Sequence, residues 1–243
     1  MRRILAFLLA APMLGWASTA DVQLDRAPIN LHDKISLQRG AQVFVNHCLN
    51  CHSASAMRYS RLTDLGLTEA QIRDNLVFTG DKVGEPMTAA MPPAIAKAAF
   101  NVVPPDLSLA ARSRGPDWLY TYLRGFYRDP ASKTGWNNAI FPNVAMPHVL
   151  YEYQGDQVMQ VTERKDSNTG ETISTHKLVL DRPGTLSPVD YDRQVADLVN
   201  YLAYMGEPAQ TDRKQWGILV LFFLAGFFVL ALMLKAEFWK DVR

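Results

Sequence analysis

The sequence predicts a mainly α-helical domain with long loops and a small β-hairpin, followed by one C-terminal transmembrane helix. Three observations lead to this fold class. Amphipathic segments that begin with helix-capping residues occur along the chain, loop-forming residues fill its middle, and residues 217–234 form an apolar run without a charge. A composition of 48% hydrophobic and 20% charged residues agrees with one folded domain plus membrane segments.

Two helices are predicted in the N-terminal half. Ser36 opens the first, which runs to Cys48 with apolar or small residues on one face. The second begins with Thr-Glu-Ala-Gln at residues 68–71, the pattern of a capping box, and Leu67 and Ile72 have the spacing of a hydrophobic staple. The face of the first helix consists of Leu37, Ala41, Phe44, Val45 and Cys48.

Two further helices are predicted in the C-terminal half. One follows Gly-Pro-Asp at residues 115–117, and the other starts with Ser-Pro-Val-Asp at residues 187–190. Gly206 and then Pro208 end the second of these. Its apolar face consists of Tyr191, Val195, Leu198, Val199, Leu202 and Met205.

The middle of the chain is rich in loop-forming residues. Residues 79–106 and 129–149 contain many Pro, Gly, Asn and small residues, so we expect long ordered loops wrapped over a large rigid ligand. Residues 157–164 and 171–180 flank a turn-rich stretch at 166–170 and predict a β-hairpin.

The N-terminus predicts export. Arg2 and Arg3 precede the apolar run Ile4–Leu14, and small residues at 18–20 suit a cleavage site, so residues 1–20 are expected to be a signal peptide. The run is too short to span a bilayer, which disfavours an uncleaved anchor. A mitochondrial presequence would be longer and richer in Arg and Ser, so a bacterial export route is favoured.

The C-terminus predicts a membrane anchor. Gly217–Leu234 would span about 27 Å as a helix, close to the thickness of a bilayer core. Trp216 and Trp239 flank it as interface residues do. We therefore expect a periplasmic domain at 21–212, a transmembrane helix at 213–236 and a cytoplasmic tail at 237–243, in a single-pass protein of the inner membrane.

The two cysteines of the chain both lie in one motif, Cys48-Leu49-Asn50-Cys51-His52. Two thiols at this spacing can add to the two vinyl groups of a haem, and the adjacent histidine then becomes an iron ligand. The motif predicts a cytochrome c-type haem domain with covalent haem c. Zinc would need a second ligand pair, and a thioredoxin-like redox pair would be expected near a βαβ pattern rather than after a helix.

The sixth ligand of the haem iron would come from another part of the chain. Methionine raises the reduction potential and closes the iron to small molecules, which suits electron transfer. Met146 is preferred because it follows the loop-rich middle, within residues 143–148. His148 would instead give bis-histidine ligation, although a histidine beside a proline in a loop is more often a surface residue. The competing methionines, expected to pack as apolar residues, are Met57, Met87, Met91, Met159 and Met205.

Several short stretches, in chain order, carry a family resemblance. They are Arg39-Gly40, Cys48–His52 with Met57-Arg58-Tyr59 after it, Pro104-Pro105-Asp106-Leu107-Ser108, Ala145-Met146-Pro147, Leu186-Ser187-Pro188 before Tyr191-Asp192, Asp197-Leu198-Val199, and Met205-Gly206-Glu207-Pro208. Together they resemble the cytochrome c1 family, the c-haem subunits of ubiquinol–cytochrome c reductase (the cytochrome bc1 complex), and most resemble its proteobacterial members. Some bacterial members carry an extra disulfide, which this chain lacks, and the 157–180 region varies among members.

The resemblance implies roles for particular residues. Met146 matches the axial methionine of the family, so His52 and Met146 would ligate the iron. Arg114 falls where the family places an arginine against a haem propionate, and a guanidinium can bind a carboxylate bidentately. Arg112 is a near competitor. Trp118 lies near a position that often holds an aromatic against the same haem edge, although core packing is its more ordinary role.

The resemblance also implies a function and partners. The chain would take an electron from the Rieske iron–sulfur subunit and pass it to a soluble or membrane-bound cytochrome c. Its terminal helix would lie in the lipid bilayer beside the cytochrome b subunit. The chain would catalyse no reaction by itself and would act as a redox subunit of the complex. A net charge of +1 shows no basic footprint of a nucleic-acid partner.

Other haem functions remain open from the residues alone. A peroxidase-like haem enzyme or a gas sensor would need an open or displaceable sixth position, and a sensor usually carries an output domain, which is not expected here. A membrane-anchored subunit of a terminal oxidase is a closer alternative. The stretches at 104–108 and 186–188 argue against it by resemblance only.

Overall fold

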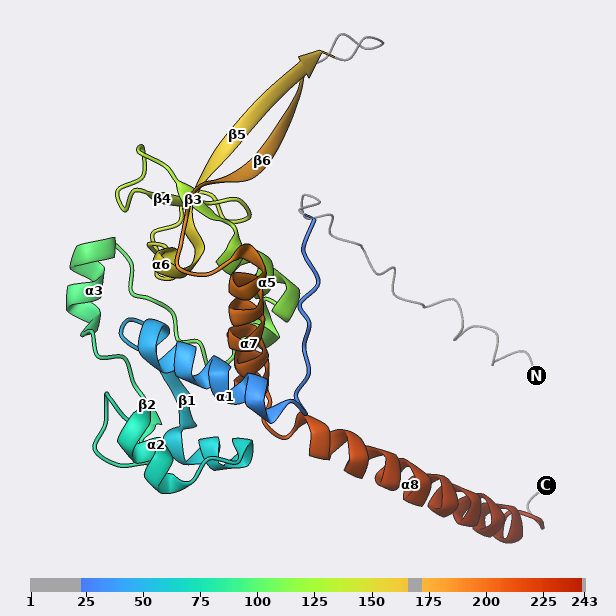
Figure 1. The fold of residues 1–243 in the computed structure, drawn as a ribbon. Helices are drawn as coiled ribbons and strands as arrows, with labels where there is room; N and C mark the ends of the chain where they lie inside the picture. Colours follow the sequence, from blue (N-terminus) through green and yellow to red (C-terminus); the bar gives the residue numbers. More distant parts are fainter. Residues whose placement is uncertain (1–22, 166–171, 242–243) are drawn as a thin grey trace.

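The computed structural model describes residues 23–165 and 172–241, and helices dominate it (Figure 1). The described strands form three separate two-stranded antiparallel sheets. This confirms the predicted mainly α-helical class. The predicted signal peptide at 1–20 and the predicted turn at 166–170 lie outside the described residues.

The crossing of α1 (Lys34–Val43) and α7 (Pro188–Gly206) forms the centre of the domain (Figure 1). Gly40 lies at the point of closest approach, where a Cβ atom would sit 2.0 Å from the backbone oxygen of Asp197. Arg39 binds the Asp197 carboxylate through two hydrogen bonds, of 2.5 and 3.0 Å. These contacts join helices from the two ends of the domain, so the core depends on long-range packing.

The start of α1 differs from the prediction. Asp33, not Ser36, caps the helix, since its carboxylate accepts a hydrogen bond from the Ser36 amide. The prediction that Ser36 opens the helix is therefore wrong. An aspartate three residues earlier offers the same capping chemistry, and Ser36 is left buried in the first turn.

The other three predicted helices are confirmed. Helix α2 (Glu69–Asn75) begins with a complete capping box between Thr68 and Gln71. Helix α5 (Pro116–Arg124) follows Gly115, and α7 begins after Ser187, whose hydroxyl accepts from the Asp190 amide. All the residues predicted for the apolar face of α7 are buried.

The two predicted loop regions contain short regular elements. Residues 79–106 include β2 (Pro86–Met87) and α3 (Pro93–Phe100), and residues 129–149 include β4 (Trp136–Asn138). The long loops predicted there thus also contain short regular elements, and proline at a helix start favours helix in α3. The remaining short elements are β1 (Ala54–Arg58), a 3-10 helix (Tyr59–Leu65), α4 (Ala110–Ser113), β3 (Phe126–Arg128) and α6 (Tyr151–Gln154).

The predicted hairpin is confirmed and is longer than expected. Strands β5 (Gly155–Lys165) and β6 (Thr172–Pro183) pair antiparallel and project from the domain (Figure 1). Residues 160–164 of β5 and residues 174–177 of β6 are exposed. The hairpin therefore adds little to the core.

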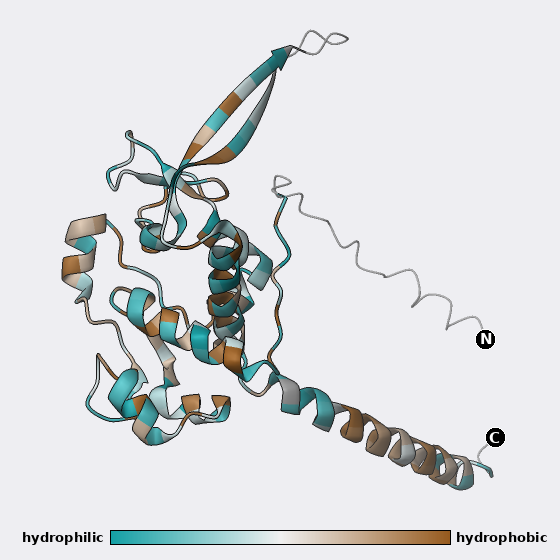
Figure 2. Ribbon diagram, in the orientation of Figure 1, coloured by the Kyte–Doolittle hydropathy of each residue, from teal (hydrophilic) through white to brown (hydrophobic). Residues whose placement is uncertain are grey.

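Helix α8 (Gln210–Phe238) leaves the domain as a long helix that is largely apolar beyond its hydrophilic first turns (Figure 2). Among the described residues it is the one helix whose length and composition suit a membrane span, at Asp212–Phe238. None of its apolar stretch is buried against the domain. It begins three residues before the predicted span, because residues 210–212 form its first turn. The predicted C-terminal apolar helix is thus confirmed.

Candidate functional site

The two cysteines and the histidine of the motif lie at the C-terminal end of α1. After Val43 the helix continues as one π-helical turn, Phe44–Cys48, a feature often found at functional sites. The chain then closes tightly, because the Cys51 and His52 amides both donate to the Cys48 carbonyl, at 3.0 and 2.8 Å. This turn brings both thiols and the imidazole together.

Both thiols of this turn are free. Cys48 is buried and Cys51 is half-buried. Burial raises the pKa of the Cys48 thiol to about 12 and also raises the pKa of Cys51. A redox-active Cys-x-x-Cys pair depends on a lowered thiol pKa. The environment therefore disfavours the thioredoxin-like alternative.

His52 is oriented by a backbone carbonyl. Its Nδ1 lies 2.8 Å from the Pro105 oxygen. A carbonyl only accepts, so Nδ1 carries the proton and Nε2 keeps its lone pair for a metal. Burial lowers the pKa of His52, although the Pro105 hydrogen bond opposes this effect. The imidazole is therefore neutral at neutral pH, as a metal ligand must be.

Hydrogen bonds to Asp106 and Ser108, here called the Asp106 clamp, hold the Pro105 carbonyl in place. The Asp106 carboxylate accepts from the Ser55 amide at 2.8 Å, the Ser55 hydroxyl at 2.7 Å and the Ser108 amide at 2.8 Å. The Ser108 hydroxyl accepts from the Ala56 amide at 3.0 Å. These bonds fasten residues 104–108 to the segment that follows His52.

Met146 lies in the loop between β4 and α6. Its sulfur accepts a hydrogen bond from the Tyr122 hydroxyl at 3.4 Å. It packs against a small cluster formed by Phe126, Trp136 and Val144, and Tyr122 contacts both this cluster and the main core. Burial raises the pKa of Tyr122 far above neutrality, so the phenol remains a donor. No hydrogen bond among the described residues joins Met146 directly to the Cys48–His52 turn.

The competing methionines occupy different environments. Met57, Met87 and Met205 are buried in the main core, and the Tyr201 hydroxyl donates to the Met87 sulfur at 3.6 Å. Met91 is half-buried, and its amide donates to the Asn50 carbonyl at 3.0 Å. Met159 is half-buried on β5. The first three thus pack as ordinary apolar residues.

His148 is not a surface residue, contrary to the expectation from its neighbouring proline. It is 2% exposed, with its ring stacked on Phe126 at 4.9 Å and edge-on to Trp136 at 5.0 Å. Burial lowers its pKa to about 4, so the ring is neutral. The prediction failed because the aromatic pocket comes from β3 and β4, which sequence reasoning did not anticipate.

Arg114 is exposed at the end of α4. Its guanidinium lies 5.2 Å from the centre of the Trp118 ring, and Trp118 stacks on Tyr122 at 4.8 Å. Within the described residues, neither Arg114 nor Arg112 forms an ion pair with a carboxylate. The stacked rings of Trp118 and Tyr122, here called the aromatic bridge, therefore connect Arg114 to Met146. The charge of Arg114 remains available to a ligand.

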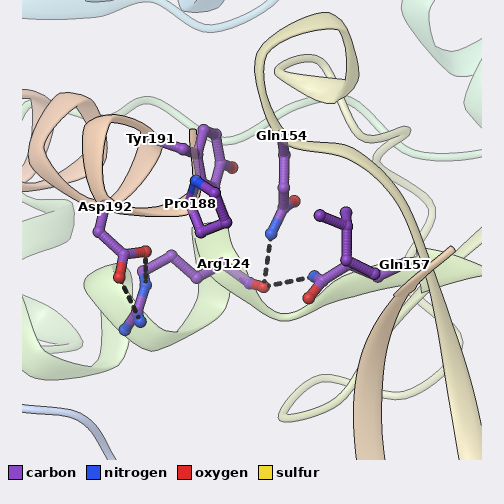
Figure 3. Close-up of a pocket in the computed structure, with 7 residues that line it drawn as sticks. Arg124, Gln154, Gln157, Pro188, Tyr191 and Asp192 are labelled. Carbon is purple, nitrogen blue, oxygen red and sulfur yellow. Dashed lines mark hydrogen bonds and ion pairs between the residues drawn. The ribbon is translucent and has the colours of Figure 1, made fainter. Parts of the chain in front are cut away.

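A small cavity elsewhere does not compete with this site. It measures about 190 Å³ and lies where α5, α7 and β5 meet (Figure 3). Small-molecule sites usually measure about 300–1,000 Å³. Arg124 pairs with Asp192 there, and the Gln154 and Gln157 side chains both donate to the Arg124 carbonyl. These interactions join the elements around the cavity to one another, so the cavity is a structural junction.

The residues of the turn fit a covalently attached haem. Two free thiols lie beside a neutral histidine whose Nε2 remains unused, and these are the groups that covalent attachment and proximal ligation of haem c use. Within residues 23–165 and 172–241, no cluster of three or more His, Cys, Asp or Glu side chains could hold a metal ion. The zinc alternative therefore finds no ligand set there.

Four contributors to this site were missed by sequence reasoning. Pro105, Asp106 and Ser108 were noted only as part of a family resemblance, and Tyr122 only as an apolar helix residue. The Pro-Pro-Asp-Leu-Ser stretch itself was the available signal, since an Asp two residues before a Ser favours side-chain-to-backbone bonding. Nothing in the sequence pairs Tyr122 with Met146.

Comparisons with known proteins identify the family of the chain. The model of the Cytochrome C1 family matches residues 25–242. Cytochrome c1 of Allochromatium vinosum is 47% identical, with 100% of both chains covered. A Nitrosomonas europaea protein named ammonia monooxygenase gamma subunit is 49% identical, over 99% of this chain and 97% of its own. Cytochrome c1 of Rhodospirillum rubrum is 28% identical, over 87% of this chain and 84% of its own.

The helical fold, the thiol–histidine turn and the apolar terminal helix define a class of haem proteins that transfer electrons at a membrane. The chain belongs to the cytochrome c1 family, of the proteobacterial type. Membership of this family implies a haem c cofactor, which agrees with the donor set of the turn.

Proposed function

We propose that this chain is the haem-carrying electron-transfer subunit of a quinol–cytochrome c reductase (cytochrome bc1) complex. Cys48 and Cys51 hold haem c through thioether bonds, and His52 and Met146 are its axial ligands. The observation that carries the proposal is the Pro105-held imidazole of His52, directly after two free thiols, in a chain of this family.

The residues of the chain prepare the site for one-electron chemistry. Bound haem iron supplies a single change between ferric and ferrous states. Pro105 keeps the proton of His52 on Nδ1 and so directs Nε2 to the metal. Met146 closes the other axial position to small molecules. The chain therefore makes no covalent bond to a substrate and serves as a non-catalytic redox subunit.

The partners follow from the family and from the membrane anchor. The chain takes its electron from the Rieske iron–sulfur subunit and delivers it to a soluble or membrane-bound cytochrome c. Residues 1–20 direct export, and residues 21–212 form the periplasmic domain. Residues 213–236 cross the inner membrane beside cytochrome b, and residues 237–243 are cytoplasmic. The exposed apolar surface of α8 supports this arrangement, because none of its apolar stretch is buried against the described residues.

Arg114 binds a haem propionate in this proposal. Its exposed guanidinium has no carboxylate partner among the described residues, and it sits over Trp118, on the same aromatic bridge as Tyr122. Arg114→Gln should change the pH dependence of the reduction potential, and Arg112→Gln serves as the matched control. Equal behaviour of the two variants would remove Arg114 from the site.

Co-purification tests the complex. A tagged chain extracted in mild detergent should bring down cytochrome b and Rieske iron–sulfur subunits in stoichiometric amounts. Their absence would overturn the assignment to this complex. Recovery of ammonia monooxygenase subunits instead would favour the activity named for the Nitrosomonas relative.

Replacement of Met146 tests the axial ligand. Met146→Leu should lower the reduction potential and let carbon monoxide bind the ferrous haem, because the thioether no longer occupies the sixth position. The matched control is Met87→Leu, which removes a buried thioether from the main core. Parental potential and spectrum in Met146→Leu would exclude this residue as the ligand.

A further inference from the structure

We propose that Tyr122 is a positioning residue for Met146, and that its hydroxyl raises the reduction potential of the haem through the Met146 sulfur. This inference rests on the proposed ligation of the iron by Met146. It assigns a redox role to a helix residue that lies outside the haem motif and outside the methionine loop.

Neighbouring aromatic rings hold the Tyr122 ring in place. Trp118, one helical turn earlier on α5, stacks on it at 4.8 Å with an interplanar angle of 11°. Phe126 meets it edge-on at 5.1 Å, and Phe141 lies 6.4 Å away. Aromatic pairs at these distances and angles are favourable. The position of the hydroxyl is therefore determined by packing.

The hydroxyl uses this position to contact the sulfur. It donates to Met146 Sδ at 3.4 Å, and no other acceptor for it occurs among the described residues. A thioether sulfur is a weak acceptor with two lone pairs. The hydrogen bond occupies one of them and leaves the second for a metal. Tyr122 thereby limits the rotation of the Met146 side chain. It also fixes the direction of the remaining lone pair on the Met146 sulfur.

The same hydrogen bond has an electronic consequence. A donor on the sulfur withdraws electron density from it, which makes the thioether a weaker donor to iron. A weaker thioether donor destabilises ferric iron more than ferrous iron, so the hydrogen bond favours the reduced state. Hydrogen bonds around a metal ligand are a recognised means of setting a reduction potential.

Tyr122→Phe tests the inference, because it removes the hydroxyl and keeps the ring. At a fixed ambient potential the ratio of ferrous to ferric haem should fall about three- to tenfold, since a net hydrogen bond contributes about this factor. This corresponds to a potential lower by about 30–60 mV, at about 59 mV per factor of ten for one electron. Met146 should remain bound, so carbon monoxide should still fail to bind.

The chain offers a matched control. The Tyr201 hydroxyl donates to the sulfur of Met87 at 3.6 Å, in the buried core. Tyr201→Phe thus removes the same kind of bond from a methionine that is not the proposed ligand. It should lower thermal stability and leave the potential unchanged. Equal potential shifts in Tyr122→Phe and Tyr201→Phe would overturn the inference, as would an unchanged potential in Tyr122→Phe.

A measurement on the parent complex tests the inference even if the Tyr122→Phe variant does not fold. In the redox-induced infrared difference spectrum, ring-labelled tyrosine should identify a phenol band that changes with the redox state of the haem. Absence of any such tyrosine band would also overturn the role of Tyr122.

Failure of this inference differs from failure of the proposed function. If Met146→Leu opens the iron but Tyr122→Phe leaves the potential unchanged, only the role of Tyr122 falls. If Met146→Leu retains the parental spectrum and potential, the ligation itself falls and the role of Tyr122 falls with it.

Discussion

At the scale of single residues, the two proposed axial ligands each contact a partner that is distant in sequence. The imidazole of His52 is oriented by Pro105, which lies 53 positions later. The sulfur of Met146 is contacted by Tyr122, which lies 24 positions earlier. The donor set is electrically neutral, because burial lowers the pKa of His52 and raises the pKa of Cys48. Neutral side chains suit such buried positions, where unpaired charges are costly.

Covalent attachment can be tested at Cys48 and Cys51. In the parent protein, acidic acetone should leave the haem on the polypeptide, because thioether bonds resist acid. In the double variant Cys48→Ala and Cys51→Ala the haem should be extracted completely. Haem that stays bound to the polypeptide of the double variant would contradict the attachment.

The clamp at Asp106 should produce a pH-dependent stability. Partial burial opposes its charge, but hydrogen bonds from Ser108 and Ser55 outweigh this effect and lower the pKa of Asp106 below its ordinary 3.8. A lowered carboxyl pKa stabilises the folded state above the unfolded value, and this contribution disappears as the pH falls through the folded pKa. Asp106→Asn should therefore be less stable than the parent near neutral pH.

The difference between the parent and Asp106→Asn should shrink on acidification. Thermal unfolding of both proteins between about pH 6 and about pH 2 measures it, and other acidic residues cancel in the comparison. A difference that stays constant down to the lowest pH would contradict the charged clamp.

At the scale of elements, the domain depends on the crossing of α1 and α7. These helices come from opposite ends of the domain sequence and pack closely together, and the Cys48–His52 turn follows at the end of α1. Gly40 permits the approach, and the ion pair of Arg39 with Asp197 lies beside it. The irregular loop 104–108 acts as a further element, because hydrogen bonds to Ser55 and Ala56 order it without regular structure.

Gly40→Ala should weaken this crossing. The new Cβ would meet a backbone oxygen and the Tyr201 side chain, so the helices would have to move apart. Overpacking of this kind costs about 1–3 kcal/mol of unfolding free energy. Gly84→Ala is the matched control, because nothing lies within 4 Å of its added Cβ. Equal unfolding temperatures for the two variants would argue against a tight crossing at Gly40.

At the scale of the whole molecule, the contacts that stabilise the folded domain do not include the apolar stretch of helix α8. Helix α8 is largely apolar beyond its hydrophilic first turns, as Figure 2 shows, and its apolar stretch is 0% buried against the described residues. The domain core lies elsewhere, chiefly on α1, α5 and α7. Exposed apolar surface of this extent requires a membrane or a partner.

A chain that ends at Lys214 should therefore lose its membrane attachment and keep its fold. It retains the ion pair of Arg213 with Glu207 and every residue of the core. Fractionation of cells should find it in the soluble periplasm with haem bound, whereas the full-length chain stays in the membrane. A truncated chain that sediments with membranes in the native state would show a second attachment.

Local signals predicted much of this fold. The capping box at residues 68–71 and the apolar face of α7 depend on neighbours within one or two turns, and both predictions are confirmed. Ser36 was misplaced because Asp33 can cap the same helix. Helix α3 was missed because its prolines and small residues also suit a loop. His148 was misjudged because its burial depends on Phe126 and Trp136, from two other strands.

The sequence by itself determined the types of side chain at the site, since two thiols and a histidine within five residues suit few functions other than haem attachment. It also determined the membrane segment, since an uncharged apolar run of bilayer length indicates a membrane. Only the tertiary structure decided how those donors are held. The Pro105 carbonyl on His52, the Asp106 clamp and the Tyr122 hydroxyl on Met146 all join residues far apart in the chain. Such contacts form only when helices and loops pack, because hydrogen bonds between distant residues depend on the positions of whole elements rather than on local pattern.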